Sequence, residues 1–146
     1  MKFTLNLKAV RVKQGLKMSN YDNQNIFAKI LRGDIPCEKI YEDEYVLSFK
    51  DVNPQAPSHI LIIPKGAYTD INDFIENASN NEIIGFNKAI PVVAHQLGIS
   101  ETSGGKGYRL ISNAGSEAHQ TVAHFHIHLL AGRNLGPMLV LSLIHI

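Results

Sequence analysis

The chain has 146 residues, of which 45% are hydrophobic, and 14 basic and 13 acidic residues leave a formal net charge of +1. This length can bury the core of a single domain, and the balanced charge argues against a protein built to bind nucleic acid or a membrane surface. We therefore expect a small-molecule partner, no nucleic acid and no membrane. A single cysteine, Cys37, excludes an intramolecular disulfide and fits the cytoplasm.

Both ends of the chain are expected to lie outside that domain. Residues 1–19 carry four lysines and one arginine but lack the continuous apolar run and cleavage site of a signal peptide. We interpret them as a disordered or non-native leader. Residues 139–146 are apolar but much shorter than the ~20 residues of a membrane span. We interpret them as a C-terminal tail of uncertain origin, which leaves residues 20–138 as the single domain.

The first half of the domain is predicted to form a short helix followed by strands. Asn25 is suited to cap a helix over residues 26–32, and Gly33 is suited to end it in the left-handed conformation. Residues 42–44 are interpreted as a hairpin turn, and two prolines make residues 53–57 a loop. Aromatic and β-branched residues predict three strands, over residues 39–41, 45–49 and 59–64.

The second half is predicted to contain a long helix and two further strands. Residues 80–97 form the helix, because apolar residues recur there at intervals of three and four. Pro91 should bend this helix near Asn87. Residues 108–112 form a fourth strand, ahead of the last one. The fold class is therefore α+β, with an antiparallel sheet of five strands, one short helix and one long helix.

Three histidines alternate with apolar residues in the run His-Phe-His-Ile-His-Leu-Leu, residues 124–130. This alternation predicts a β-strand, because successive side chains of a strand point to opposite faces of the sheet. All three imidazoles would share one face, with neighbours ~7 Å apart, while the apolar residues face the core. Groups with this spacing are suited to surround one small anion or one metal.

The side chains alone support phosphorus chemistry on this strand. A neutral imidazole is a nucleophile at pH 7, so His126 could divide one displacement at phosphorus into two steps through a covalent adduct. His124 could fix the tautomer of a neighbour, and a protonated His128 could donate to phosphate oxygens or to the leaving group. This scheme requires no metal. Uncharged donors could hold the remaining oxygens, namely Asn113, Gln120 and Thr121.

The histidine run is accompanied by other short stretches that match a known family pattern. That pattern alternates three histidines with apolar residues and ends in two apolar residues, and residues 124–130 satisfy it throughout. Further matches occur in the same order along the chain, at residues 25–30, 34–36, 41–43, 49–59, 63–65, 107–109, 113 and 120–122. The chain therefore resembles the histidine triad family, close to its nucleotide-binding branch.

The resemblance implies a role for each candidate residue. It makes His126 the nucleophile that forms a nucleotidyl-histidine on the α-phosphate, with His128 and His59 as partners on the phosphate side. His124 becomes a buried orienting group. Asp51 would accept both ribose hydroxyls, which suits a carboxylate with paired acceptor oxygens. An apolar slot would hold the base, formed by Ile26, Phe27, Ile30, Phe49 and Val52.

Several of these residues also fit purely structural roles. The aromatic and aliphatic residues of the slot are at least as well suited to the core. Asp51 precedes a proline-rich loop and could simply be a turn residue, and Asn113 is ambiguous in the same way.

The function implied by the resemblance is hydrolysis of a P–N or P–O bond at the α-phosphate of a nucleoside 5'-phosphoramidate or related nucleotide ester. The substrate would be a purine nucleotide or a nucleotide conjugate, the protein a two-fold homodimer, and no cofactor or metal is implied. Three alternatives remain open at this point. The protein could be a dinucleoside polyphosphate hydrolase, a nucleotide-binding or scaffolding protein with incidental hydrolysis, or a zinc protein, since histidines at i and i+2 of a strand can ligate zinc.

Overall fold

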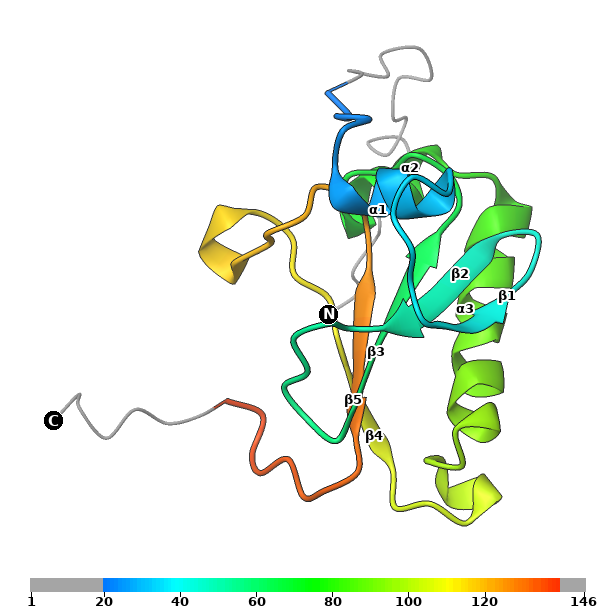
Figure 1. The fold of residues 1–146 in the computed structure, drawn as a ribbon, viewed down its shortest axis with the longest axis vertical. Helices are drawn as coiled ribbons and strands as arrows, with labels where there is room; N and C mark the ends of the chain where they lie inside the picture. Colours follow the sequence, from blue (N-terminus) through cyan, green and yellow to red (C-terminus); the bar gives the residue numbers. More distant parts are fainter. Residues whose placement is uncertain (1–19, 140–146) are drawn as a thin grey trace, which may run out of the picture.

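The computed structural model describes residues 20–139 and contains a five-stranded antiparallel sheet with helices on both faces (Figure 1). The strands lie side by side in the order β1-β2-β3-β5-β4, with bounds β1 (Lys39–Glu42), β2 (Val46–Lys50), β3 (Ser58–Pro64), β4 (Tyr108–Ile111) and β5 (Ile127–Ala131). The helices are α1 (Ile26–Leu31), α2 (Ile71–Asn77) and α3 (Asn80–Gln96), with short 3-10 turns η2 (Glu101–Ser103) and η3 (Ser116–Ala118). This confirms the predicted fold class.

The expectations for the two ends of the chain concern residues outside the described part. The leader expected over residues 1–19 lies outside it entirely, and the tail expected over residues 139–146 lies outside it from residue 140 onward. Within residues 20–139, no helix is long and apolar enough to cross a membrane.

Helix α1 forms for the local reasons that its sequence predicts. The side chain of Asn25 accepts a hydrogen bond from the backbone N–H of Ala28 at 2.9 Å and so caps the first turn. The helix ends at Leu31, and Gly33 takes a φ of 84°, which the absence of a Cβ allows. The buried residue of this helix, Phe27, points toward the sheet.

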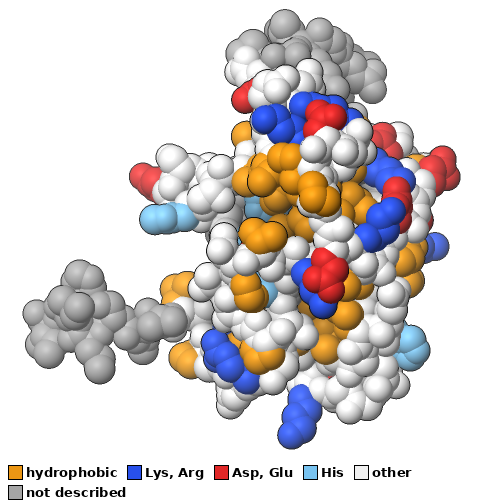
Figure 2. Space-filling view, in the orientation of Figure 1, with side chains coloured by type: hydrophobic (Ala, Val, Ile, Leu, Met, Phe, Trp, Pro, Cys, Tyr) orange, Lys and Arg blue, Asp and Glu red, His pale blue; other side chains and the backbone are white. Residues whose placement is uncertain are grey.

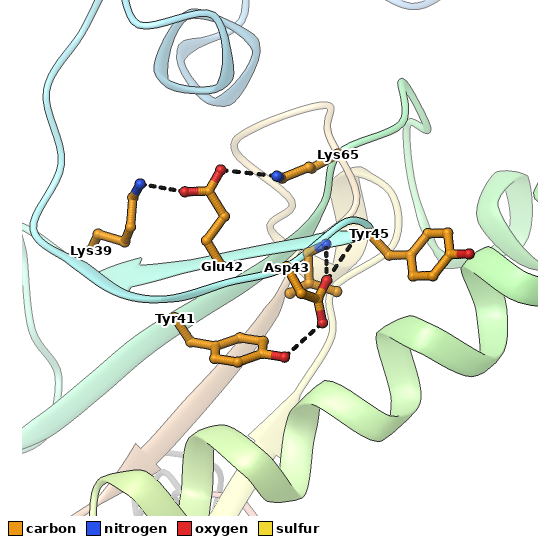
Figure 3. A network of polar contacts seen from close by, with 7 residues as sticks. Lys39, Tyr41, Glu42, Asp43, Tyr45 and Lys65 are labelled. Carbon is orange, nitrogen blue, oxygen red and sulfur yellow. Dashed lines mark hydrogen bonds and ion pairs between the residues drawn. The ribbon is translucent and has the colours of Figure 1, made fainter.

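The predicted hairpin between β1 and β2 is held by the side chain of Asp43 (Figure 3). Its Oδ1 accepts from the backbone N–H groups of Tyr45 and Val46 at 2.8 and 2.9 Å, and the Tyr41 hydroxyl donates to Oδ2 at 2.7 Å. Next to this turn, exposed ion pairs join β1 to the end of β3 through Lys39, Glu42 and Lys65.

Helix α2 was not predicted from the sequence. The side chain of Asp70 caps it by accepting from the backbone N–H of Asp73 at 2.9 Å. Its single buried side chain, Phe74, packs against Phe86 of α3 and Phe125, with ring centroids 5.2 and 4.9 Å apart. The helix therefore depends on contacts with distant segments as well as on its cap.

Helix α3 begins with a capping box, in which Ser79 and Glu82 satisfy each other's backbone N–H groups. It is continuous through Pro91, which is exposed on the helix. The carbonyl of Asn87 loses its helical partner there, but both residues lie on the solvent side, where water can replace the missing donor. The bend expected near Asn87 stays a prediction.

The two faces of the sheet carry different cores. One face packs against α2 and α3, with a cluster that includes Val46, Ile60, Ile62, Phe74, Phe86, Val93, Phe125 and Leu129. The other face packs against α1, with a smaller cluster made of Phe27, Leu47, Phe49, Leu61 and Ile63. Alternate residues of β2 and β3 belong to different clusters, as the strand period requires.

The prediction that one strand carries all three histidines is wrong in its extent. Strand β5 begins at Ile127, so His124 and His126 lie before it. In the ladder, Ile62 pairs with Ile127, and two residues farther along β3 stands Pro64, which has no N–H to donate. The Pro64 carbonyl is instead bound by the His124 ring, and the Phe125 N–H donates to the carbonyl of Tyr68.

Candidate functional site

A cavity of about 780 Å³ opens on the α1 side of the sheet. It lies between α1, the segment before β1, the ends of β2 and β3, the loop after β2, and the segment before β5. Figure 2 shows hydrophobic side chains gathered on this face, with histidine visible among them. Its lining combines apolar side chains with three imidazoles and two carboxylates, which is the character of a ligand site rather than of a packing defect.

Most of the residues that the sequence singled out line this cavity. They come from four separate stretches of the chain, and they are Ile26, Phe27, Ile30, Phe49, Asp51, Val52, His59, Thr121, His126 and His128. Among the predicted site residues, Asn113, Gln120 and His124 do not line it.

Gln120 is held by backbone groups of its own loop and of a distant segment. Its amide nitrogen donates to the carbonyls of Thr69 and Val122 at 2.7 and 3.1 Å, and its amide oxygen accepts from the N–H of Gly115. Both amide hydrogens are therefore engaged by backbone carbonyls in this structure, and a role for Gln120 as a donor to phosphate oxygens stays a prediction. Asn113 follows β4 and is half-buried away from the cavity lining.

Sheet geometry explains how distant residues meet in the cavity. Leu61 of β3 lies directly opposite His128 of β5, and both face the α1 side. His59 is two residues before Leu61 and therefore shares this face. Phe49 of β2 pairs with Leu61, and Asp51 follows Phe49 by two residues, so the carboxylate also lies on this side.

The ring of His126 has a defined tautomer. Its Nδ1 lies 2.7 Å from the backbone carbonyl oxygen of His124, and a carbonyl can only accept. The hydrogen of the neutral ring is therefore on Nδ1, and Nε2 carries the lone pair. Burial lowers the pKa of His126, partly offset by this hydrogen bond and by Asp51, so the neutral ring is favoured near pH 7.

His124 is fully buried behind the cavity. Its Nε2 lies 2.8 Å from the carbonyl oxygen of Pro64, and its Nδ1 lies 2.5 Å from the hydroxyl of Tyr21. Burial lowers the pKa of His124 to about 4, with a further lowering from the neighbouring His126. The His124 ring is thus neutral and structural, and the backbone carbonyl of His124 orients the imidazole of His126.

His59 and His128 form a directed pair. Nδ1 of His59 accepts from the backbone N–H of Gln55 at 3.0 Å, so its ring hydrogen is on Nε2. That nitrogen lies 2.8 Å from Nδ1 of His128, which accepts, and the neutral His128 ring therefore carries its own hydrogen on Nε2. Burial and the rings of His126 and His59 lower the pKa of His128 to about 4.

Asp51 stands at the edge of this cluster. Its Oδ1 accepts from the backbone N–H of Asn53 at 2.8 Å, and its Oδ2 lies 3.4 Å from Nε2 of His59. Burial lowers the pKa of His59, and the Asp51 carboxylate opposes this effect. Asp51, His59 and His128 each offer one ligand atom, all within 4.8 Å of one another, and so could hold a divalent metal such as zinc.

The apolar end of the cavity is built around Phe27. Its ring meets Phe49 and His126 edge to face, with centroids 5.6 and 5.0 Å apart. Ile26 and Val52 are largely exposed at the mouth, with 45% and 89% of their surface accessible. Phe27 and Phe49 are therefore both core and lining residues, which resolves the ambiguity left by the sequence.

The sequence reasoning missed several lining residues. The ion pair between Lys50 and Glu38, 2.6 Å long, lies at the rim, and the free thiol of Cys37 lines the apolar end. The family resemblance placed Phe49 in the base slot, but nothing in the sequence indicated that its exposed neighbour Lys50 reaches the rim. Residues 35–38 enter because the chain turns back under α1.

Comparison with known proteins gives a consistent result. A family model described as the HIT domain matches residues 32–135. The chain is 54% identical over 119 residues to an uncharacterised 13.2 kDa HIT-like protein of Azospirillum brasilense, with 82% of this chain and 94% of the relative covered. It is 44% identical over 117 residues to the purine nucleoside phosphoramidase of Escherichia coli K12, with 80% and 93% covered.

A solved structure of similar sequence has the same fold. The chain superposes with a TM-score of 0.71 on a HIT family hydrolase from Clostridium thermocellum, with 43% identity and coverage of 82% of this chain and 99% of that chain.

Proposed function

Since the chain belongs to the HIT domain family, we propose that it hydrolyses the P–N bond of a purine nucleoside 5'-phosphoramidate or a closely related nucleotide ester. Residues 20–138 act as one catalytic domain. Its similarity to a purine nucleoside phosphoramidase and to a HIT family hydrolase supports the reaction class. The residue roles rest on the hydrogen bonds of the imidazole cluster.

His126 acts as the nucleophile in the first step. The lone pair on Nε2 attacks the α-phosphorus, a P–N bond to the ring forms, and the P–N bond to the amine breaks. The amine leaves with a proton taken from solvent. The ring becomes positively charged, and the His124 carbonyl, already bound to Nδ1–H at 2.7 Å, stabilises that charge.

Water completes the reaction in the second step. A water oxygen bonds to phosphorus, the bond to His126 breaks, and the lone pair returns to Nε2 while a proton returns to solvent. His128 directs its Nε2 hydrogen to a phosphate oxygen through both steps, and the Thr121 hydroxyl offers another donor from the same lining.

The other end of the cavity binds the nucleoside. Asp51 accepts hydrogen bonds from the ribose hydroxyls, and the planar base packs between the aliphatic side chains of α1 and Phe49. The volume of about 780 Å³ lies within the ordinary range for a small-molecule site.

The observation that carries the proposal is that Nε2 of His126 has no hydrogen-bond partner among residues 20–139, in a cavity whose other two imidazoles are neutral and hydrogen-bonded to each other. Intact-protein mass spectrometry after brief mixing with an adenosine phosphoramidate tests it. We expect an adduct of one adenylyl group that maps to His126 and is absent from His126→Gly. Binding of AMP without amine release by the wild type would reject hydrolysis and leave a nucleotide-binding protein.

Dialysis against a chelator tests the metal alternative. The proposed steps use only imidazole lone pairs and hydrogens, so we expect kcat to survive complete metal removal. A stoichiometric ion whose removal abolishes turnover, and whose binding is lost in His128→Asn, would show that Asp51, His59 and His128 work as a metal site.

We also propose a two-fold homodimer located in the cytoplasm. Among the described strands, β4 is an edge of the sheet, with Tyr108 and Leu110 exposed on it. Ile84 and Val92 of α3 are exposed as well. A partner that extends the sheet at β4 would cover apolar surface of this kind. Light scattering at micromolar concentration should give twice the monomer mass.

A further inference from the structure

A phenol from outside the cavity completes the hydrogen bonding of the His124 ring. Tyr21 lies in the segment before α1, and its hydroxyl is 2.5 Å from Nδ1 of His124. The two rings meet edge to face, with centroids 5.6 Å apart. Tyr21 does not line the cavity, and its direct contact with the imidazole cluster is the one to His124.

The partners on each side fix the direction of this hydrogen bond. Nε2 of His124 faces the carbonyl oxygen of Pro64, which can only accept, so Nε2 carries the ring hydrogen. Nδ1 therefore keeps its lone pair and accepts from the phenol. Burial raises the pKa of Tyr21, so the hydroxyl stays protonated and is the donor.

His124 also determines the tautomer of His126. The backbone carbonyl of His124 accepts the Nδ1–H of His126 at 2.7 Å, which leaves Nε2 free to attack. The Phe27 ring also meets both imidazoles edge to face, with centroids 6.3 Å from His124 and 5.0 Å from His126. A shift of the His124 ring is therefore passed to His126 through the backbone and through Phe27.

We propose that Tyr21 is a positioning residue for the nucleophile, acting through the buried ring of His124. Without the hydroxyl, Nδ1 of His124 is a buried acceptor with no donor among the described residues, and such a group favours rotation or a change of tautomer. The His124 carbonyl then moves, and part of the His126 population presents N–H instead of a lone pair to the phosphorus. This inference rests on the proposed function for its catalytic consequence.

Tyr21→Phe removes only the hydroxyl. We expect kcat for the adenosine phosphoramidate to fall about tenfold, as small displacements of a nucleophile do, while KM stays within about twofold because the cavity lining is unchanged. Tyr41→Phe is the matched control, since it removes a phenol that donates to Asp43 at 2.7 Å in the β1–β2 turn. It should lower the melting temperature to a similar extent and leave kcat unchanged.

The nitrogen NMR shifts of the His126 ring provide a readout that needs no turnover. The wild type should show a protonated Nδ1 and an unprotonated Nε2, and Tyr21→Phe should shift both signals toward a mixture of tautomers. An unchanged kcat in folded Tyr21→Phe would overturn the proposal. If the wild type itself proves inactive, the proposed function fails, and the NMR shifts alone decide whether Tyr21 holds the His126 tautomer.

Discussion

The Nε2 of His59 lies 2.8 Å from the Nδ1 of His128, across neighbouring strands of one sheet. Because the backbone N–H of Gln55 occupies the other nitrogen of His59, the hydrogen between the two rings belongs to His59. His128 must then hold its own hydrogen on Nε2. A backbone amide in the loop after β2 thus determines which nitrogen of His128 can donate.

Two amide substitutions separate the hydrogen bonds of His59. Glutamine extends an N–H donor about as far as Nε2 and can still reach His128, whereas asparagine can accept from Gln55 but is too short for His128. We expect His59→Gln to keep most of the wild-type kcat and His59→Asn to lose about tenfold. Steady-state kinetics on folded variants measures this, and equal losses would show that the bond to His128 is irrelevant.

Asp51 should confer a preference for ribose over deoxyribose. A carboxylate can accept from both ribose hydroxyls, whereas the isosteric amide accepts at only one atom. We expect wild type to bind AMP more tightly than 2'-deoxy-AMP, and Asp51→Asn to lose most of that preference, with AMP binding weakened about tenfold. Titration calorimetry with both ligands tests this. An unchanged preference in the variant would remove Asp51 from the ribose contact.

Mild acid should destabilise the fold. The pKa values of His124 and His128 are lowered to about 4 in the folded protein, while their ordinary value is 6.5. Between pH 6.5 and 4 the unfolded state therefore binds more protons than the folded state. The free energy of unfolding has its full value above pH 6.5 and falls as the pH decreases toward 4. His124 alone should contribute a loss of about 3 kcal/mol.

Urea unfolding at several pH values measures this dependence. His128→Gln should reduce the slope between pH 6.5 and 4, because it removes one of the two imidazoles whose pKa is lowered to about 4. A free energy of unfolding that is flat across this range would contradict the neutral, buried imidazoles.

Substitution of Gly85 by alanine should lower the free energy of unfolding, whereas the same substitution raises it at most helical glycines. Gly→Ala in a helix usually stabilises by about 1 kcal/mol, but a Cβ at Gly85 would overlap the Tyr45 ring. We expect Gly85→Ala to lower the free energy of unfolding by roughly 1–3 kcal/mol without changing kcat. In a Tyr45→Ala background the same substitution should become stabilising, and denaturant titration of all four proteins completes the cycle.

Local signals in the sequence were sufficient for much of the fold. Asn25 identifies the start of α1 and Gly33 its end, because capping depends on residues a few positions apart. The predicted strands coincide with β1 to β4 within one or two residues. By contrast, α2 has only seven residues, too few for a helical period to stand out, and its burial depends on Phe86 and Phe125.

The candidate site shows the same division between local and distant causes. Alternation correctly separated the apolar side of residues 124–130 from the histidine side, since Phe125 and Leu129 lie in the α3 core. The start of β5 depends on a proline in another strand. Gln120 is bound by a carbonyl 51 positions away and Tyr21 by a ring 103 positions away. No pattern within a short window contains such contacts.

The alternation of β5 has a practical consequence for protein engineering. Leu129 anchors the strand to the long helix, while its neighbour His128 belongs wholly to the opposite side. A directed-evolution library aimed at thermal tolerance can therefore vary Leu129 and its packing partners while the cavity lining on the reverse side remains untouched.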